Sequence, residues 1–334
     1  ICRTEKKFSL DSKKKISLFC NLSLDSVLML ENAQTIYEVP LKLHNEGLLK
    51  KLNLHFSIKN KQTNLDFWNK FHQKFINLKK EIDIAIVGKY TNLSESYKSL
   101  NEALFHSGIF NKIKVNISWI DSRHLLNKKN LDKFLKDFHG ILVPGGFGKD
   151  GSEGKINAIK FAKENSIPFL GICFGMQLAI IESVRNLKGF ENASSTEFGK
   201  TKLPIISMMH EWEKNKKIHH QDLENLGGSM RLGSYQSLIR KNTLIYNIYK
   251  KTTIHERHRH RYEVNFNYLT FIKKSGVVLS GMSPNRKLVE IMERKDHPWF
   301  LGVQFHPELK STPFSPHPIF NSFISATEKF KNKN

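Results

Sequence analysis

The chain has 334 residues, more than a single compact core usually holds, so we expect two domains. Hydrophobic residues make up 39% of the sequence, enough to build cores, which argues against a wholly disordered protein. The net charge of +22 is spread along the chain without a basic–aromatic repeat, which favours a lysine-rich surface over nucleic-acid binding but is compatible with nucleotide ligands.

The first 80 residues carry a pattern of their own. Residues 15–22 (KISLFCNL) predict a strand, and residues 27–54 mix helix and strand signals. Because so short a segment cannot build a sizeable core alone, we expect residues 1–55 to be the remnant of an incomplete domain. Residues 56–80 are polar and lysine-rich, and their second half (FWNKFHQKFINLKK) predicts an amphipathic helix. We interpret residues 56–80 as the connector between two domains.

Strands and helices then alternate up to residue 186. The predicted strands are 83–87, 115–120, 140–143 and 168–172, and the predicted helices are 97–104, 131–138, 155–164 and 175–186. Such alternation is typical of right-handed crossovers and of a largely parallel sheet covered by helices on both faces. A strand-rich stretch and a terminal helix near 318–331 follow. The expected fold class for residues 81–330 is therefore α/β, with a mixed, largely parallel sheet flanked by helices.

Cysteine usage and hydropathy bear on the compartment. Three scattered cysteines, Cys2, Cys20 and Cys173, do not make a disulfide framework, which favours a reducing, cytoplasmic environment. The longest apolar run, around 168–181, is shorter than a membrane span, so we expect no membrane contact. No secretory signal is visible, and because the chain begins with Ile1 rather than Met, we expect it to be a piece of a longer protein.

Cys173 lies where a predicted strand turns into a predicted helix, between Gly171 and Gly175. The pattern G-x-C-x-G at such a turn is typical of a nucleophile elbow, because the glycines let strand and helix pass closely around a strained backbone. A helix N-terminus also leaves more of a thiol as thiolate at neutral pH. A buried, inert cysteine is the competing interpretation, and it explains the two glycines poorly.

Two further segments could complete a catalytic site. In LGVQFHPEL (301–309), a predicted strand ends at His306, and Glu308 follows two residues later. Such a glutamate can orient the histidine as a general base, although a solvated strand end is the alternative for this segment alone. The glycines of PGGFG (144–148) can turn backbone N–H groups towards an oxyanion, and a plain tight turn is the alternative. Because all three segments follow strands, we expect one site for acyl transfer through a thioester.

These segments resemble a known family. GICFGMQLA, PGGFG and QFHPE are similar to motifs of the class I (triad) glutamine amidotransferases. Longer segments resemble the CTP synthase family more narrowly: VGKYTNLSESYKSLNEAL (87–104), NASSTEFG (192–199), GGSMRLG (227–233), ERHRHRYEVN (256–265) and HPWFLGVQFHPE (297–308). Residues 2–22 and 31–41 are similar to the end of that family's synthetase domain.

The resemblance implies a glutaminase domain that releases ammonia from glutamine. In that family the ammonia passes to a synthetase domain, where UTP is phosphorylated by ATP and aminated to CTP. Glutamine hydrolysis needs no cofactor, whereas the complete enzyme uses ATP and Mg²⁺, is activated by GTP and forms a homotetramer. The family's ATP-binding loop, magnesium carboxylates and most of its UTP site precede the first residue of this chain. We therefore expect this piece alone not to make CTP.

The resemblance also assigns roles to residues. Cys173 would be the nucleophile, His306 the base and acid, and Glu308 its orienting partner. The oxyanion hole would be formed at Gly146 and Phe174, where many relatives have leucine in place of the phenylalanine. The residues implied to bind glutamine are Gly146, Phe174, Gly175, Met176, Gln177, Glu197 and Arg261. Those implied to contact nucleotides are Lys15, Glu31, Asn32 and Ala33.

Two alternatives stay open from the residues alone. The chain could serve another amidotransferase with a different acceptor, although the segments around 192–199 and 256–265 argue against it. It could also be a catalytically idle module that binds nucleotides, RNA or partner subunits, which predicts a damaged triad that the sequence does not show. The RHRHR run (257–261) invites a metal site, but no further ligand at suitable spacing completes a zinc set, so we expect no metal.

Overall fold

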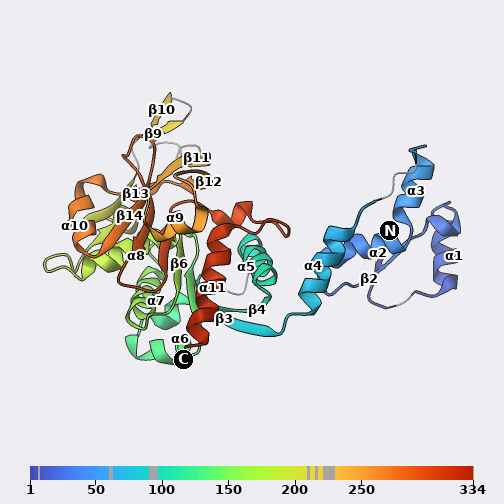
Figure 1. Ribbon diagram of the computed structural model, residues 1–334, viewed down its shortest axis with the longest axis horizontal. Helices are drawn as coiled ribbons and strands as arrows, with labels where there is room; N and C mark the ends of the chain where they lie inside the picture. The colour runs from blue at the N-terminus through green and yellow to red at the C-terminus, as the bar shows by residue number, and fades with distance from the viewer. Residues whose placement is uncertain are drawn as a thin grey trace. The chain divides into compact units, whose positions relative to one another are not determined.

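The computed structural model describes residues 1–333 with the exception of 7, 60–62, 90–96, 209–210, 215–216 and 221–229. Parts of two segments that carry the family resemblance, 90–96 and 227–229, therefore lie outside the described residues. The chain divides into two compact units, Ile1–Leu78 and Lys79–Asn334 (Figure 1). Each unit is described by itself. Within the described residues, no helix has the length and hydropathy that crossing a bilayer requires.

The first unit is small and mainly helical. Its elements are β1 (Cys2–Thr4), α1 (Leu10–Phe19), β2 (Met29–Glu31), α2 (Val39–Asn45), α3 (Leu48–His55) and α4 (Asp66–Ile76), with β1 parallel to β2. Tyr37 packs edge-on against Phe71 of α4, with ring centroids 5.0 Å apart. The amphipathic helix expected in the connector is thus α4, and it belongs to this unit.

The strand predicted at residues 15–22 is wrong. Residues 10–19 form helix α1, which begins after Ser9, whose hydroxyl accepts a hydrogen bond from the Ser12 N–H. This N-cap satisfies one of the free donors of the first turn and fixes the helical start. The alternating apolar residues that suggested a strand, from Ile16 onwards, have no buried position in α1. An unburied alternation therefore did not decide the secondary structure, and the upstream cap did.

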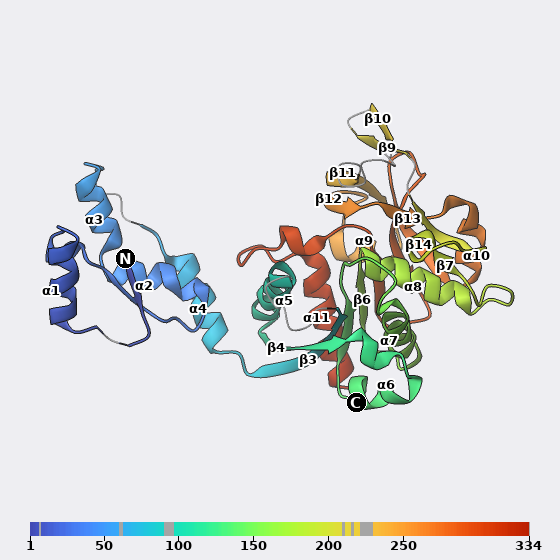
Figure 2. The same cartoon turned by 180° about the vertical axis from the view of Figure 1, so that it is seen from behind.

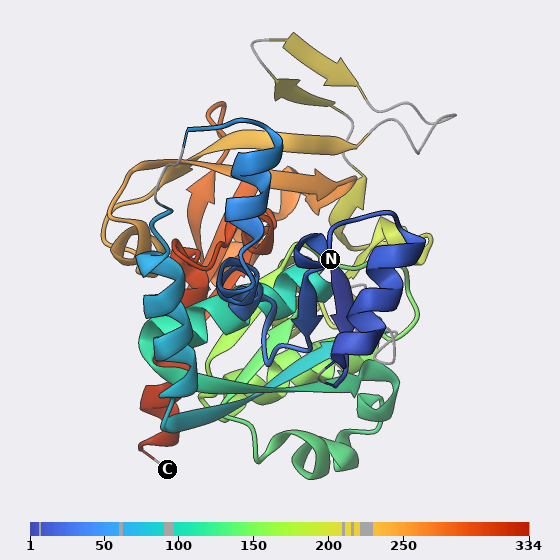
Figure 3. The ribbon, with the colours of Figure 1, turned by 90° about the vertical axis from the view of Figure 1, so that its right-hand side faces the viewer.

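The second unit is built on a nine-stranded sheet in the order β12-β11-β14-β15-β16-β6-β5-β3-β4. The five strands from β16 to β4 are parallel, and the pairings from β12 to β16 are antiparallel. The pairs β11–β12 and β3–β4 form opposite ends of this sheet (Figure 3). The strands are β3 (Lys80–Gly88), β4 (Ile113–Asp121), β5 (Gly140–Val143), β6 (Phe169–Ile172), β11 (Arg231–Ile239), β12 (Thr253–His260), β14 (Val277–Met282), β15 (Val289–Arg294) and β16 (Phe300–Val303).

Two smaller sheets accompany the large one. Strand β13 (Tyr262–Val264) pairs with β8 (Pro204–Met208), which pairs with β7 (Ser194–Ser195). Strands β9 (Glu211–Lys214) and β10 (Lys217–His220) pair antiparallel.

Helices cover both faces of the large sheet, as Figures 1 and 2 show. Successive side chains of β3 point to opposite faces of the sheet, and both faces are apolar. Ile84 belongs to the hydrophobic cluster on one face, and Ala85 belongs to the hydrophobic cluster on the other. The first cluster includes residues of α5 (Lys98–Asn111), α9 (Leu244–Tyr249) and α11 (Pro318–Lys331). The second includes residues of α6 (Leu131–Leu135), α7 (Ser152–Glu164), α8 (Phe174–Arg185) and α10 (Leu269–Lys274). The expected α/β fold with a mixed sheet is confirmed.

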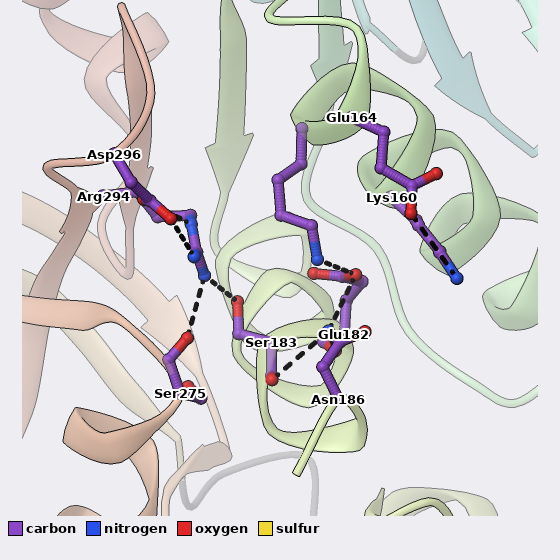
Figure 4. Close-up of polar contacts among 9 residues, drawn as sticks. Lys160, Glu164, Glu182, Ser183, Asn186, Ser275, Arg294 and Asp296 are labelled. Carbon is purple, nitrogen blue, oxygen red and sulfur yellow. Dashed lines mark hydrogen bonds and ion pairs between the residues drawn. The ribbon is translucent and has the colours of Figure 1, made fainter.

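Polar contacts hold the C-terminal end of α8 (Figure 4). Glu182, which is only 2% exposed, accepts hydrogen bonds from Lys163 of α7 at 2.5 Å and from Asn186 at 3.2 Å. Arg294 of β15 donates to the Ser183 hydroxyl at 3.3 Å. These contacts tie α8 to a neighbouring helix and to the sheet. The helix that begins directly after Cys173 is therefore held at its far end by these contacts.

Candidate active site

Cys173 occupies a tight turn between β6 and α8. Its backbone angles, φ 51° and ψ −101°, are unfavourable for a residue with a side chain. A Cβ placed on Gly171 would lie 2.8 Å from the Gly175 carbonyl carbon, and one placed on Gly175 would lie 2.1 Å from the Val143 oxygen. Only glycine fits at either position. The two glycines thus allow β5, β6 and the start of α8 to meet closely enough to form the elbow.

The thiol of Cys173 is held by a chain of buried amides. Gln304 Nε2 donates to Cys173 Sγ at 3.5 Å. Gln177 Nε2 fixes the direction of that amide, because it donates to Gln304 Oε1 at 3.1 Å and to the Tyr262 carbonyl at 2.8 Å. A donor aimed at sulfur stabilises a thiolate. Gln304 was missed in the sequence, where its place two residues before His306, on the same side of an extended chain, was the available signal.

His306 and Glu308 lie beside this thiol. Glu308 Oε1 is 2.7 Å from His306 Nδ1, and His306 begins the short 3₁₀ turn Pro307–Lys310. Burial by itself disfavours the charged imidazole, but the charges of Cys173 and Glu308 and the hydrogen bond that Nδ1 donates to Glu308 outweigh it and raise the pKa of His306 well above its usual value. His306 Nε2 is buried and has no hydrogen-bond partner among the described residues. Since Nδ1 is taken by Glu308 and Cys173 acts on the same ring, Nε2 is the nitrogen that serves the thiol.

The glycine loop after β5 packs directly against the histidine. A Cβ on Gly145 would lie 2.8 Å from His306 Cε1, so only glycine leaves room for the ring. The next residue, Gly146, is close to Phe174, since a Cβ there would lie 3.6 Å from Phe174 Cδ1. The loop, the elbow and the histidine, which are far apart in the sequence, thus meet at the carboxyl ends of β5, β6 and β16. Backbone N–H groups at such a junction can bind an oxyanion.

Glu197 and Arg261 lie at one side of this junction. Glu197, in the 3₁₀ turn Thr196–Phe198, accepts a hydrogen bond from the Gly148 N–H at 2.7 Å. Burial raises the pKa of Glu197, while the charges of Lys89, Lys155 and Arg261 oppose that rise. Arg261 Nε is buried without a hydrogen-bond partner among the described residues. The two residues expected to hold the amino-acid end of glutamine are thus electrostatically coupled.

Other residues expected to line the glutamine pocket are more buried than the sequence suggested. Met176 is 0% exposed and packs into the core, and Phe174 is 2% exposed. Gln177 is 3% exposed and is engaged with Gln304. The side chains of Met176 and Gln177 are therefore closed off from solvent in this structure, and their expected contact with glutamine stays a prediction. Gly175 packs against the backbone of β5.

The four residues matched to nucleotide contacts all lie in the first unit. Lys15 is exposed on α1, and Glu31 ends β2. Asn32 Oδ1 accepts a hydrogen bond from Arg3, and Ala33 follows it. Their expected role in nucleotide binding stays a prediction.

The two histidines of the RHRHR run belong to a buried polar network. His258 and His260 point to the same side of β12, with 3.2 Å between His258 Nδ1 and His260 Nε2. They lie beside the buried ion pair between Arg231 and Glu290, in which Arg231 Nη2 is 2.8 Å from Glu290 Oε1. Burial, reinforced by the charge of Arg231, lowers the pKa of both histidines well below the usual value. Within the described residues, no group of three or more His, Cys, Asp or Glu side chains is arranged to hold a metal ion.

Comparison with known proteins agrees with this geometry. Residues 92–326 match the family model described as "Glutamine amidotransferase class-I", and residues 1–58 match "CTP synthase N-terminus". The chain is 51% identical to the CTP synthase of Pelagibacter ubique over 99% of its own length and 62% of that protein. It is 48% identical to the CTP synthase of Zymomonas mobilis, over 98% of its own length and 61% of that protein. The chain thus spans about six tenths of the curated relatives it matches.

A solved structure supports the same relationship. The glutaminase domain of Trypanosoma brucei CTPS, solved with bound acivicin, is 35% identical to this chain. The alignment covers 74% of this chain and 94% of that one, with a TM-score of 0.66. The resemblance inferred from the sequence motifs is confirmed by these matches. The chain belongs to the class I glutamine amidotransferase family.

Proposed function

We propose that the second unit hydrolyses the side-chain amide of glutamine and releases ammonia. The observation that carries the proposal is the convergence of Cys173, His306 and Glu308 at one sheet edge, with the thiol on a glycine-flanked elbow. The raised pKa of His306 supports it, because an imidazolium beside Cys173 favours the thiolate that attacks a carbonyl.

The chemistry follows from the positions of these groups. The Cys173 thiolate attacks the amide carbon of glutamine, and backbone N–H groups at Gly146 and Phe174 stabilise the oxyanion that develops. His306 Nε2 gives its proton to the leaving nitrogen, which departs as ammonia, and a glutamyl thioester remains. His306 then takes a proton from the water that cleaves the thioester. Glu308 holds Nδ1 so that Nε2 faces the reacting atoms.

Recognition of glutamine is assigned to the charged pair beside the elbow. The carboxylate of Glu197 suits the α-ammonium group of the substrate, and the guanidinium of Arg261 suits its α-carboxylate. Both are partly desolvated, which strengthens these interactions relative to water. Gln177 orients the side-chain amide of Gln304, and Gln304 Nε2 donates to the sulfur of Cys173.

We further propose that this ammonia serves the conversion of UTP to CTP. The support is the similarity of the whole chain to CTP synthases and the match of residues 1–58 to their N-terminal domain. On this proposal UTP, ATP, CTP and the activator GTP act through the complete protein, with Lys15 and residues 31–33 as nucleotide contacts, and the complete protein is a cytoplasmic homotetramer. Among the described residues, no group of three or more His, Cys, Asp or Glu side chains is arranged to hold Mg²⁺.

Release of glutamate from glutamine tests the proposal. The purified chain is compared with its Cys173→Ala variant, which removes little volume and should keep the fold. We expect even slow glutamate release to disappear completely in the variant. Equal release by both proteins would overturn the assignment of the nucleophile.

A further inference from the structure

A buried lysine lies behind the oxyanion loop. Lys155, in the first turn of α7, is only 2% exposed, and lysine is almost never buried to this extent without a partner. Its Nζ atom is 5.0 Å from the centroid of the Phe174 ring. It is also 3.4 Å from the point that a Cβ on Gly146 would occupy. The ammonium group thus lies close to both residues whose backbone donors we assign to the oxyanion.

The fold holds this lysine in place. A Cβ on Gly154 would lie 1.7 Å from the Ser122 carbonyl oxygen, so α7 packs directly on the backbone of the 3₁₀ turn Ser122–Leu125. The neighbouring position, Lys155, is thereby directed into the protein instead of towards solvent. The face of an aromatic ring attracts a cation, and the attraction is larger where water is excluded.

Charged groups from four neighbouring segments face Lys155. Burial, reinforced by the charge of Lys89, lowers the pKa of Lys155 to about 8. The carboxylates of Asp150, Glu197 and Asp121 act in the opposite direction. The ammonium group is therefore the main form at neutral pH, and the neutral amine becomes the main form in mildly alkaline solution.

We propose that Lys155 is a positioning residue of the oxyanion hole, whose ammonium group holds the Phe174 ring and thereby the Phe174 N–H beside Gly146. The proposal rests on the glutaminase function proposed above. A leucine side chain at position 174 would offer no π-face to the cation. Lys155 and Phe174 then form one functional pair, and each matters only while the other is present.

The test compares two reagents on Cys173. The chloromethyl ketone analogue of glutamine places a carbonyl oxygen in the oxyanion hole as it reacts, whereas methyl methanethiosulfonate reacts with the thiol without one. We expect Lys155→Met to slow the ketone about 30-fold, the size of a desolvated cation–π contact, and to leave the thiosulfonate rate unchanged. The matched control is Lys160→Met on the same helix, where the Lys160 side chain is 41% exposed and is paired with Glu164 (Figure 4).

A double-mutant cycle and a pH profile complete the test. Phe174→Leu should slow the ketone as Lys155→Met does, and the double variant should be no slower than either, because the contact is already lost. The parent should react with the ketone faster than Lys155→Met, and this ratio of rates should fall as pH rises through about 8, where Lys155 loses its charge. Lys155→Arg stays charged, so its rate should remain above that of Lys155→Met at the same pH. If Lys155→Met does not fold, Phe174→Leu still tests the difference between the two reagents, and Lys155→Arg still tests the pH dependence of the ketone rate.

Three results would overturn the proposal. Additive effects of the two substitutions would show that Lys155 and Phe174 act independently, and equal slowing of both reagents would show a general disturbance of Cys173. Unchanged rates would remove any role for Lys155. Failure of the glutaminase function looks different: the parent's Cys173 would then react with the ketone no faster than the exposed Cys20, and the proposal would fall with it.

Discussion

Two buried histidine clusters in the second unit differ in the charge that faces the imidazole. His306 lies between Cys173 and Glu308, and its pKa is raised well above the usual value. His258 lies beside Arg231 and His260, and its pKa is lowered well below that value. Burial acts in the same direction on both rings, towards the neutral form.

The difference teaches that charged partners decide whether the effect of burial on an imidazole is reversed or kept. Anionic neighbours reverse the effect of burial on His306, which makes that ring a proton donor beside the thiol. A cationic neighbour reinforces burial on His258, which keeps that ring neutral inside a polar network. The cluster around His306 is suited to chemistry, whereas the cluster around His258 holds β11, β12 and β15 together.

The largest expected effect is on the catalytic cluster. His306→Asn removes the proton donor, so we expect glutamate release to fall by about 10²–10⁴-fold while the protein stays folded. Glutamate assays and circular dichroism measure the two quantities. His255→Asn, at an exposed histidine on β12, is the matched control and should keep parental activity. If His306→Asn kept full activity, His306 would not be the proton donor, and the contrast with His258 would be wrong.

The second cluster should respond in stability instead. Glu290→Leu leaves the Arg231 guanidinium buried without its counter-charge, so we expect the free energy of unfolding to fall by about 3–5 kcal/mol. Urea unfolding measures the loss. Because Arg231→Met/Glu290→Leu removes both charges, it should recover much of the stability. A double variant as unstable as Glu290→Leu would show that lost packing, not the unpaired charge, causes the defect.

Glu308→Ala should have an intermediate effect. This carboxylate orients His306 and raises its pKa but does not touch the substrate, so we expect kcat to fall by about 10–100-fold, less than for His306→Asn. Steady-state kinetics with glutamine gives the value. Unchanged kcat would mean that the triad has been assigned wrongly.

The smallest effect is an opposite dependence of stability on pH. The raised pKa of His306 contributes stability that is fully present below pH ~6.5 and is lost as pH rises through the folded value. The lowered pKa of His258 contributes stability that is present above pH ~6.5 and is lost as pH falls. Melting temperatures from about pH 5 to 8 should therefore show His306→Asn losing most at low pH and His258→Asn at high pH. Parallel curves would contradict the assignment.

The sequence predicts much of the second unit and of its centre. Glycines on both sides of Cys173 indicate the elbow because no other residue fits there, and that constraint is local. The sequence predicts less about side chains whose burial depends on segments that are distant along the chain. Nothing local indicates that Lys155 points inward, since the cause is the packing of Gly154 against Ser122. In the same way, the helix at residues 10–19 depends on its cap at Ser9, outside the segment that suggested a strand.

Site-resolved labelling tests the central claim most directly. The chain is treated with the chloromethyl ketone analogue of glutamine, digested, and analysed by mass spectrometry, with and without excess glutamine. We predict modification of Cys173 alone, although it is 6% exposed, with Cys2 and Cys20 spared and with glutamine protecting. Modification of exposed Cys20 in preference to Cys173, or labelling of Cys173 that glutamine does not slow, would contradict a glutamine-binding nucleophile at this elbow.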